Sequence, residues 1–86
     1  MTGPSAEILA IKALAYLADS EGALGRFLSE SGSDVVNLRE AAGDPQFLAA
    51  VVDFLLSDDA LLTGFCDAES LEPRIMHLVR HALPGG

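Results

Sequence analysis

The sequence predicts an all-α fold, a compact single-domain bundle of five to six short helices joined by short loops. Apolar residues recur at helical spacing along most of the chain, and no segment carries a strand signal. Residues that favour helix starts and ends separate the apolar segments at short intervals. Half of the 86 residues are hydrophobic, which is enough for one core in one domain. We expect residues 5–83 to be ordered and residues 1–4 and 84–86 to be loose ends.

The first helix is expected to open at Pro4 or Ser5 and to run to about Asp19. Its polar positions are few, and Lys12 and Asp19 form its main wet side. A helix this apolar needs cover on most sides, which favours a central core helix. The alternative is that part of its surface is a face for a dimer or for another partner. The candidate contact residues of such a face are Leu9, Ala13, Tyr16 and Leu17.

Two shorter helices are expected next. Residues 20–22 interrupt the first apolar pattern, and residues 31–32 end the second helix. Three apolar side chains at helical spacing define that second helix, Leu24, Phe27 and Leu28. Ser33 is a suitable N-cap for the third helix, and Gly43 fits the left-handed position past its end.

The segment from Asp44 to Phe65 holds the longest apolar run of the chain, bounded by two helix starts. Asp44 followed by Pro45 indicates an N-cap with proline at the first helical position. The apolar side chains after it sweep about half the circumference of a helix, which predicts a wide buried face. Residues 57–59 offer a second start, for a short helix that packs back on the first. Residues 67–70 are expected to form a loop.

The last helix is expected to start at Glu72-Pro73 and to run to about Leu83. From Pro73 onward the chain has no acidic side chain, so this helix is weakly basic. Its apolar face is expected to dock on the acidic body, through Ile75, Met76, Leu78, Val79 and Leu83. The alternative is that the helix is released to bind a partner or a membrane surface, but two arginines are few for attraction to anionic lipid.

The net charge of −8 is the one compositional outlier, and it first suggests a basic partner. Most of the acids, however, lie at or within a turn of an expected helix start, where carboxylates cap N–H groups or meet the helix dipole. These acids are Glu7, Glu21, Asp34, Asp44, Asp58, Asp59, Glu69 and Glu72. Nucleic-acid binding is disfavoured, because phosphate contacts need a basic patch and the chain has five Lys and Arg in all.

The location of the protein is expected to be cytoplasmic. Charged residues interrupt every apolar run before about 18 residues, which predicts no membrane span. The N-terminal segment has no basic n-region, and Lys12 falls where a secretory signal would need to be uncharged. A single cysteine, Cys66, excludes an intrachain disulfide.

One segment carries a family resemblance. The pattern LREAAGDPQFLAAVVDFLLSDDALLTGF at residues 38–65, together with LGRFLSESG at residues 24–32, resembles a family of small bacterial proteins that form a domain of unknown function. The likeness extends from about Ala6 to Leu83, and DPxFL…DFLLxDxxLL is its most specific part. The resemblance implies a compact helical domain in the cytoplasm. It implies no activity, cofactor or catalytic residue.

His77 and His81 stand one helical turn apart in HLVRH, a spacing that can present two imidazoles to one metal ion. Arg74 lies on the same face and Arg80 at its edge, and their charges would oppose a bound cation. No Glu follows the first histidine, as it does in HExxH. We therefore interpret these histidines as part of a solvated face and expect no metal and no cofactor.

Cysteine and aspartate offer two further candidates. Cys66 could be a nucleophile or a third ligand beside the histidines, but it lies in register with Leu62 and is expected to be a small, inert core residue. Asp58 and Asp59, with Asp53 nearby, could pair as acid and base or bind a divalent cation. Capping at a helix start is the favoured interpretation, because paired carboxylates act in catalysis only when they are enclosed.

Three functions are compatible with these observations. We expect a small interaction module, an adaptor or regulator that binds another protein or a second copy of itself through apolar helix surface. The enzyme alternative is a metal- or thiol-dependent activity built from Cys66, His77 and His81. The third possibility is an acidic, charge-steered ligand of a basic protein.

Overall fold

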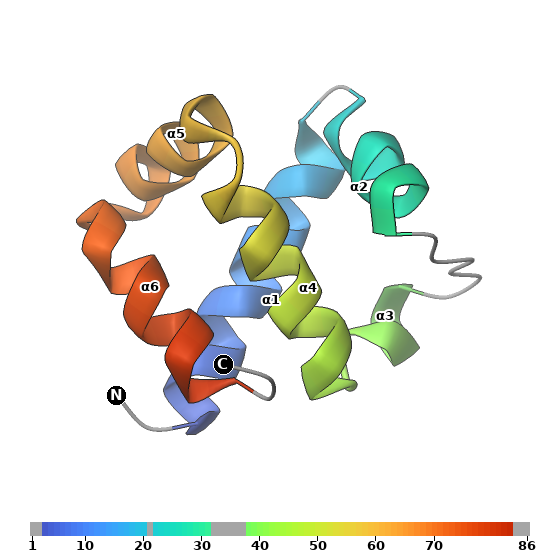
Figure 1. Ribbon diagram of the computed structural model, residues 1–86, viewed down its shortest axis with the longest axis horizontal. Coiled ribbons are helices and arrows are strands. Elements are labelled where there is room, and N and C mark those ends of the chain that lie inside the picture. The colour runs from blue at the N-terminus through green and yellow to red at the C-terminus, as the bar shows by residue number, and fades with distance from the viewer. Residues whose placement is uncertain (1–2, 21, 32–37, 84–86) are drawn as a thin grey trace.

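Six helices make up most of the part of the chain that the computed structural model describes, residues 3–20, 22–31 and 38–83. They are α1 (Gly3–Asp19), α2 (Ala23–Ser31), α3 (Leu38–Ala41), α4 (Pro45–Leu56), α5 (Asp59–Glu69) and α6 (Pro73–Ala82) (Figure 1). These described residues contain no strand, and the predicted all-α bundle is confirmed. The Ser33 cap predicted for the third helix lies outside the described residues.

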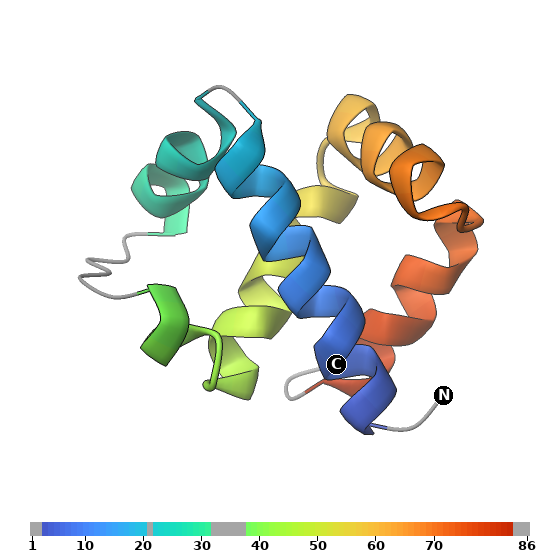
Figure 2. The same ribbon diagram turned by 180° about the vertical axis from the view of Figure 1, so that it is seen from behind.

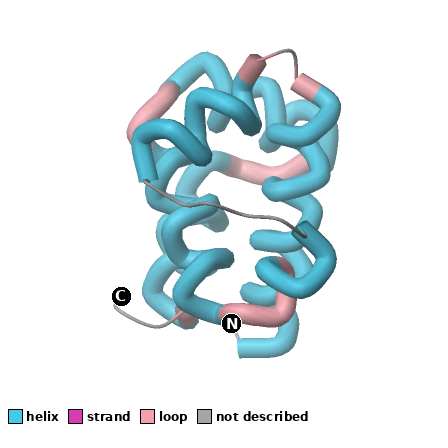
Figure 3. The backbone as a smooth tube through the Cα atoms, turned by 90° about the vertical axis from the view of Figure 1, so that its right-hand side faces the viewer, coloured by secondary structure: helices cyan, strands magenta, loops and turns pink. Residues whose placement is uncertain are grey.

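The centre of the molecule is the crossing of α1 and α4. Figure 2 shows the whole of α1 in front of α4, with α5 and α6 on one side and α2 and α3 on the other. α6 packs against both central helices, α2 packs against both near the end of α1, and α5 packs against α4 and α6. The described connections are short, as the side view in Figure 3 shows. No neighbouring helix crosses the outer side of α1 in Figure 2.

Small side chains line the buried face of α1, the helix that packs against both α4 and α6. Ala6, Ala10 and Ala13 recur at helical spacing and have no exposed surface. Alanine leaves room for the ridges of a facing helix. On α4 the buried face carries larger side chains, Leu48, Val51, Val52 and Leu55. The prediction that the first helix is a central core helix is confirmed.

Two predicted helix starts are confirmed in detail. The Asp44 carboxylate accepts a hydrogen bond from the Gln46 N–H at 3.0 Å, and Pro45 occupies the first position of α4. The Asp58 carboxylate accepts from the Ala60 and Leu61 N–H groups at 3.1 and 3.2 Å. Both aspartates have extended backbone, as N-caps do. Short-range chemistry therefore fixes where α4 and α5 begin.

The other acids expected near helix starts differ from one another. Glu72 lies at the predicted start of α6 in extended backbone, but it makes no capping hydrogen bond, and its carboxylate accepts from Arg74 Nε. Glu69 is the last residue of α5, and it pairs with Lys12 at 3.4 Å. Glu7 lies beyond the first turn of α1. Fewer of the acidic residues therefore cap a helix or lie in its first turn than the sequence predicted.

The predicted loop at residues 67–70 is also wrong, since α5 continues to Glu69. Nothing in Asp67-Ala68-Glu69 breaks a helix, and the stop comes at Ser70, which adopts the left-handed conformation at φ 56°. The Leu71 N–H then donates to the Cys66 carbonyl at 2.8 Å, which satisfies one of the last carbonyls of the helix.

Gly43 does not adopt the predicted left-handed conformation; among the described glycines Gly22 does, at φ 77°. After α3 the chain continues in right-handed turns. The Gly43 N–H donates to the Glu40 carbonyl at 3.0 Å, and the Asp44 N–H donates to the Ala41 carbonyl at 2.9 Å. These bonds span three residues, as in a tight 3₁₀ turn. They lead directly to the cap of α4.

The last helix is docked, as predicted, although one of its predicted contacts is wrong. Met76, Val79 and Leu83 are buried against the core, and Ile75 is half-buried. Leu78 points outward with 51% of its surface exposed. It lies two positions from Met76, a rotation of about 200°, so both side chains cannot face the core.

Candidate functional site

Four exposed apolar residues form a continuous strip on the outer side of α1, and we call Ile8, Ile11, Ala15 and Ala18 the outer strip. Ile8 is 56% exposed and Ile11 is 42% exposed. Their spacing of three, four and three residues keeps all four on one side of a helix. This side is opposite the buried alanines of α1. The outer strip is therefore an apolar surface without cover in the described part of the molecule.

The contact residues predicted for a partner were Leu9, Ala13, Tyr16 and Leu17, and none of them is exposed in the structure. Ala13 and Leu17 have no exposed surface, because the face that carries the small side chains turns toward the core. Leu9 and Tyr16 are half-buried. A helical projection centred on the alanines would have found the outer strip, since its four residues lie on the opposite side.

A hollow of about 400 Å³ borders the outer strip on the side of α5. Lys12, Ala15, Tyr16, Asp19, Ala68 and Glu69 line it. The Lys12–Glu69 ion pair spans its rim, and the Tyr16 ring meets the edge of Phe65 with 5.7 Å between centroids. A Cβ at Gly64 would overlap the Tyr16 hydroxyl, so glycine at this position lets the ring lie against α5. The lining of the hollow therefore combines two alanines and a tyrosine ring with three charged side chains.

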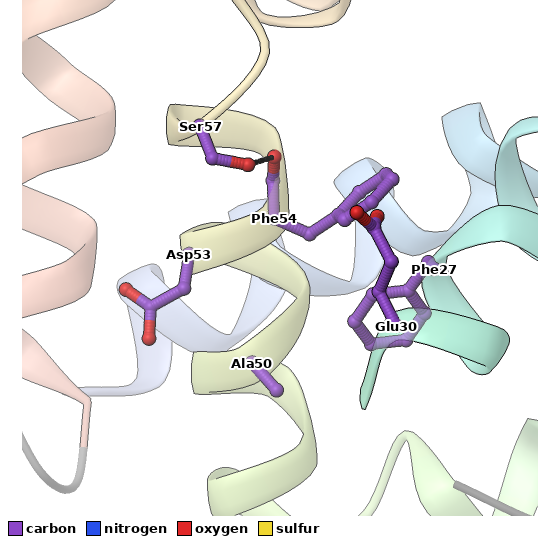
Figure 4. Close-up of a pocket in the computed structure, with 6 residues that line it drawn as sticks. All are labelled: Phe27, Glu30, Ala50, Asp53, Phe54 and Ser57. Carbon is purple, nitrogen blue, oxygen red and sulfur yellow. Dashed lines mark hydrogen bonds between the residues drawn. The ribbon is translucent and has the colours of Figure 1, made fainter. Parts of the chain in front are cut away.

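A second hollow, of about 270 Å³, lies between α2 and α4 (Figure 4). Phe27 and Phe54 supply its aromatic wall, and Glu30 lies over them. The Asp53 carboxylate points to the opposite side of α4 from Glu30 and accepts from Arg80 Nε at 2.6 Å. The charged groups of this hollow already have partners within the chain.

Arg26 closes the same region from α2. Its guanidinium lies 5.0 Å from the Phe54 ring centroid, donates to the Asp58 carboxylate at 2.5 Å and approaches Glu30 at 3.8 Å. A cation above an aromatic face is attracted electrostatically by the quadrupole of the ring. This arrangement ties the start of α5 to α2. It is a structural link rather than an open site.

The residues predicted to carry metal or thiol chemistry are separated by burial. His77 and His81 are exposed on α6, whereas Cys66 is buried in α5 with 2% of its surface exposed. The predicted burial of Cys66 is confirmed. Within the described ranges, no group of three or more His, Cys, Asp and Glu side chains is placed to hold a metal ion. The same part of the chain has no helix long and apolar enough to cross a membrane.

The three aspartates considered as a catalytic or metal-binding set do not act together. Asp53 pairs with Arg80 from α6, and Asp58 pairs with Arg26 from α2 while it caps α5. Asp59 is exposed in the first turn of α5. Each carboxylate is therefore engaged by a different element or faces solvent, and the capping interpretation of Asp58 is confirmed.

The profile of one protein family, described as "Protein of unknown function (DUF3572)", matches residues 4–86. The chain belongs to the DUF3572 family. The resemblance inferred from residues 38–65 is thereby confirmed at the level of an uncharacterised family. Comparison with curated proteins and with solved structures gave no match. The function of this DUF3572 domain has to be argued from its surface.

Cys66 is expected to be unreactive in the native domain. Burial, and secondarily the neighbouring Asp67 charge, raise the pKa of the Cys66 thiol above 9.0, and the thiolate is the reactive form. The native protein should therefore react slowly with Ellman's reagent at pH 8, and rapidly in denaturant. Because the raised pKa favours the neutral thiol in the folded state, stability should also fall as the pH rises above 9. Rapid labelling of the native protein would contradict this burial.

Asp58→Asn is expected to destabilise the domain at pH 7, although asparagine still caps α5. The hydrogen bond from Arg26, followed by the Leu61 N–H, holds the pKa of the Asp58 carboxyl below its ordinary 3.8. The charged form therefore stabilises the folded state above that value, and this contribution is lost as pH falls through the folded pKa. Thermal melts of Asp58→Asn, with Asp59→Asn as control, should converge with wild type as the pH falls from 3.8 through the folded pKa. A difference that persists below that pKa would contradict the assignment.

Proposed function

We propose that this protein is a small cytoplasmic protein–protein interaction module, an adaptor or regulator, that binds its partner through the outer strip of α1. The observation that carries the proposal is the exposure of Ile8 and Ile11 on one face of the central helix. Burying apolar surface is worth about 25 cal/mol per Å², so an uncovered pair of isoleucines beside two alanines favours association. Single exposed apolar residues are ordinary, but a strip that runs along a helix is not.

The character of the interior supports binding over catalysis. The described residues contain no buried polar or charged side chain, and no buried side-chain nitrogen or oxygen without a hydrogen-bond partner. Active sites gather titratable groups with shifted pKa values in a cleft. Here the shifted groups, Asp58 and Cys66, each have a structural cause in an ion pair or in burial. A binding role needs none of this machinery.

An acidic, charge-steered ligand is the second candidate, and one observation favours it. The described lysine and the three arginines whose side chains are described each pair with an acid, and these are Lys12, Arg26, Arg74 and Arg80. The net charge of −8 is presented to the surroundings, and these four positive charges are already engaged within the chain. Binding of this kind should weaken sharply as salt rises past about 0.15 M. Binding through the outer strip should survive that change.

The test is an affinity capture from native cell extract with three forms of the protein: wild type, Ile8→Ser and Leu78→Ser. Ile8 and Leu78 are similarly exposed, at 56% and 51%, but lie on different helices. A partner held by wild type and by Leu78→Ser, and lost by Ile8→Ser in 0.3 M salt, is the expected result. Equal capture of the partner by all three forms would contradict the proposal that the outer strip is the binding surface. Loss of the partner from wild type in 0.3 M salt would favour the charge-steered ligand.

A further inference from the structure

The outer strip has a symmetric spacing with unequal side chains. Residue 13 is the midpoint between positions 8 and 18 and also between positions 11 and 15. A second helix that runs antiparallel to the first, with both helices centred at this level, therefore places position 8 of one copy beside position 18 of the other. It likewise places position 11 beside position 15. The first two positions are isoleucines and the last two are alanines. An antiparallel copy of α1 would therefore set each large side chain against a small one.

We infer that the outer strip binds a second copy of the same chain, with the two α1 helices antiparallel across a two-fold axis at the level of Ala13. The inference rests on the proposed function, because it names the partner that the outer strip takes. A two-fold interface must be complementary to itself. The outer strip meets that condition, because its two isoleucines come first and its two alanines last, and the rotation sets each isoleucine against an alanine.

The hollow beside α5 provides the second complementary feature. With about 100° between successive residues, Ile8, Lys12 and Asp19 lie within about 40° of one another, on the side of α1 that borders this hollow. The two-fold rotation brings this side of one helix against the same side of the other. The partner's Ile8 then lies level with Ala18, between Ala15 and Asp19, where it enters the hollow. There the branched aliphatic side chain contacts Ala15 and Ala68, the two alanines that line the hollow.

Charge complementarity follows from the same geometry. Lys12 of one copy lies on the same side of the contact as the partner's Asp19, about five residues or about 7.5 Å away along the axis. An extended lysine side chain bridges that gap. Lys12 is 53% exposed at its side chain, and Asp19 is exposed. Lys12 also pairs with Glu69 of its own chain at 3.4 Å, so the partner's Asp19 joins an existing ion pair, and each two-fold contact contains this arrangement twice.

The net charge distinguishes a second copy from a basic partner. Two chains of −8 repel each other at long range, and salt screens that repulsion within a Debye length of about 8 Å at 0.15 M. Self-association through the outer strip should therefore strengthen as salt rises. Association with a basic protein should weaken over the same range.

The test is sedimentation velocity over a series of protein concentrations at 0.05, 0.15 and 0.5 M salt. The wild type is expected to show a monomer–dimer equilibrium whose dissociation constant falls as salt rises. Ile8→Ser should raise that constant at least ten-fold, while Leu78→Ser leaves it within two-fold of wild type. A monomer at every concentration and salt, or a dimer unaffected by Ile8→Ser, would overturn the inference.

Charge reversal checks the register of the two helices. Lys12→Asp and Asp19→Lys should each weaken the dimer, because each places two like charges together. The double variant carries both reversals and restores opposite charges across the axis, so its dissociation constant should return toward that of wild type. Additive weakening in the double variant would exclude the Lys12–Asp19 contact and with it this antiparallel register.

The capture experiment separates this inference from the proposed function. A monomeric protein that still holds a different partner through Ile8 would overturn the second-copy inference and leave the interaction role intact. If the protein is monomeric and Ile8→Ser captures the same proteins as wild type, both the second-copy inference and the proposed interaction role of the outer strip are overturned.

Discussion

Phe27→Ala is expected to lower the free energy of unfolding by about 3–5 kcal/mol. Phe27 is 1% exposed and is the aromatic residue through which α2 joins the core. Its ring meets the edges of Phe47 and Phe54 with centroid distances of 5.6 and 5.3 Å. Edge-on aromatic pairs are worth about 0.5–1.5 kcal/mol beyond the area that they bury. The substitution therefore loses both the buried ring and two specific contacts.

A loss of this size is a large part of the total stability. A domain of 86 residues is expected to have about 4–13 kcal/mol, from about 0.05–0.15 kcal/mol per residue. Urea unfolding followed by circular dichroism measures the change, provided that the slope of the transition stays constant. Phe27→Leu is the control, since it retains most of the apolar volume and should cost less than half as much. A loss below about 1 kcal/mol for Phe27→Ala would show that the aromatic cluster contributes little.

The helix starts could be predicted because their chemistry is local. Asp44 and Asp58 cap the N–H groups two or three residues ahead of them, and both roles are visible in a four-residue window. The end of α5 could not be predicted in this way. Ser70 stops the helix in a left-handed conformation that serine rarely takes, and the Leu71 N–H bond to Cys66 accompanies it. The tertiary placement of the next segment selects that stop.

The ion pairs between helices could not be predicted from the sequence. Arg26 and Asp58 are 32 residues apart, and Arg80 and Asp53 are 27 apart. The helix pattern places each of them on a surface, but their pairing depends on how α2, α4 and α6 are arranged in space. The same distance in sequence explains why the acids were assigned too readily to helix starts. The local sequence can predict that an acid caps a helix, but it cannot predict that the acid pairs with a basic residue on another helix.

The orientation of α1 was the most consequential feature that the sequence left open. Apolar residues surround most of this helix, so its pattern alone favours no single buried face. The structure decides the question, because the face with Ala6, Ala10 and Ala13 is fully buried where α1 packs against α4 and α6. Leu17 is buried with that face, and Ile8 is exposed on the opposite one. The candidate interaction surface therefore changes from the predicted residues to the outer strip.

Two substitutions in the same helix test this orientation directly. Leu17→Ser is expected to cost about 3–5 kcal/mol, because it removes a fully buried side chain and leaves a hydroxyl in an apolar core. Ile8→Ser makes the same kind of change on the exposed side, where helix propensities of isoleucine and serine are similar, and should cost less than about 0.5 kcal/mol.

Urea unfolding of both variants, at a concentration where the wild type is monomeric, keeps self-association out of the comparison. The expected outcome is a Leu17→Ser protein that is largely unfolded or marginal, beside an Ile8→Ser protein with the wild-type midpoint. Equal losses would mean that α1 is covered on both sides, and the outer strip would then be part of the core. A large loss of unfolding free energy for Leu17→Ser alone would show that Ile8 and Ile11 can be substituted without destabilising the fold. Any effect of such substitutions on binding could then be assigned to the outward face of α1.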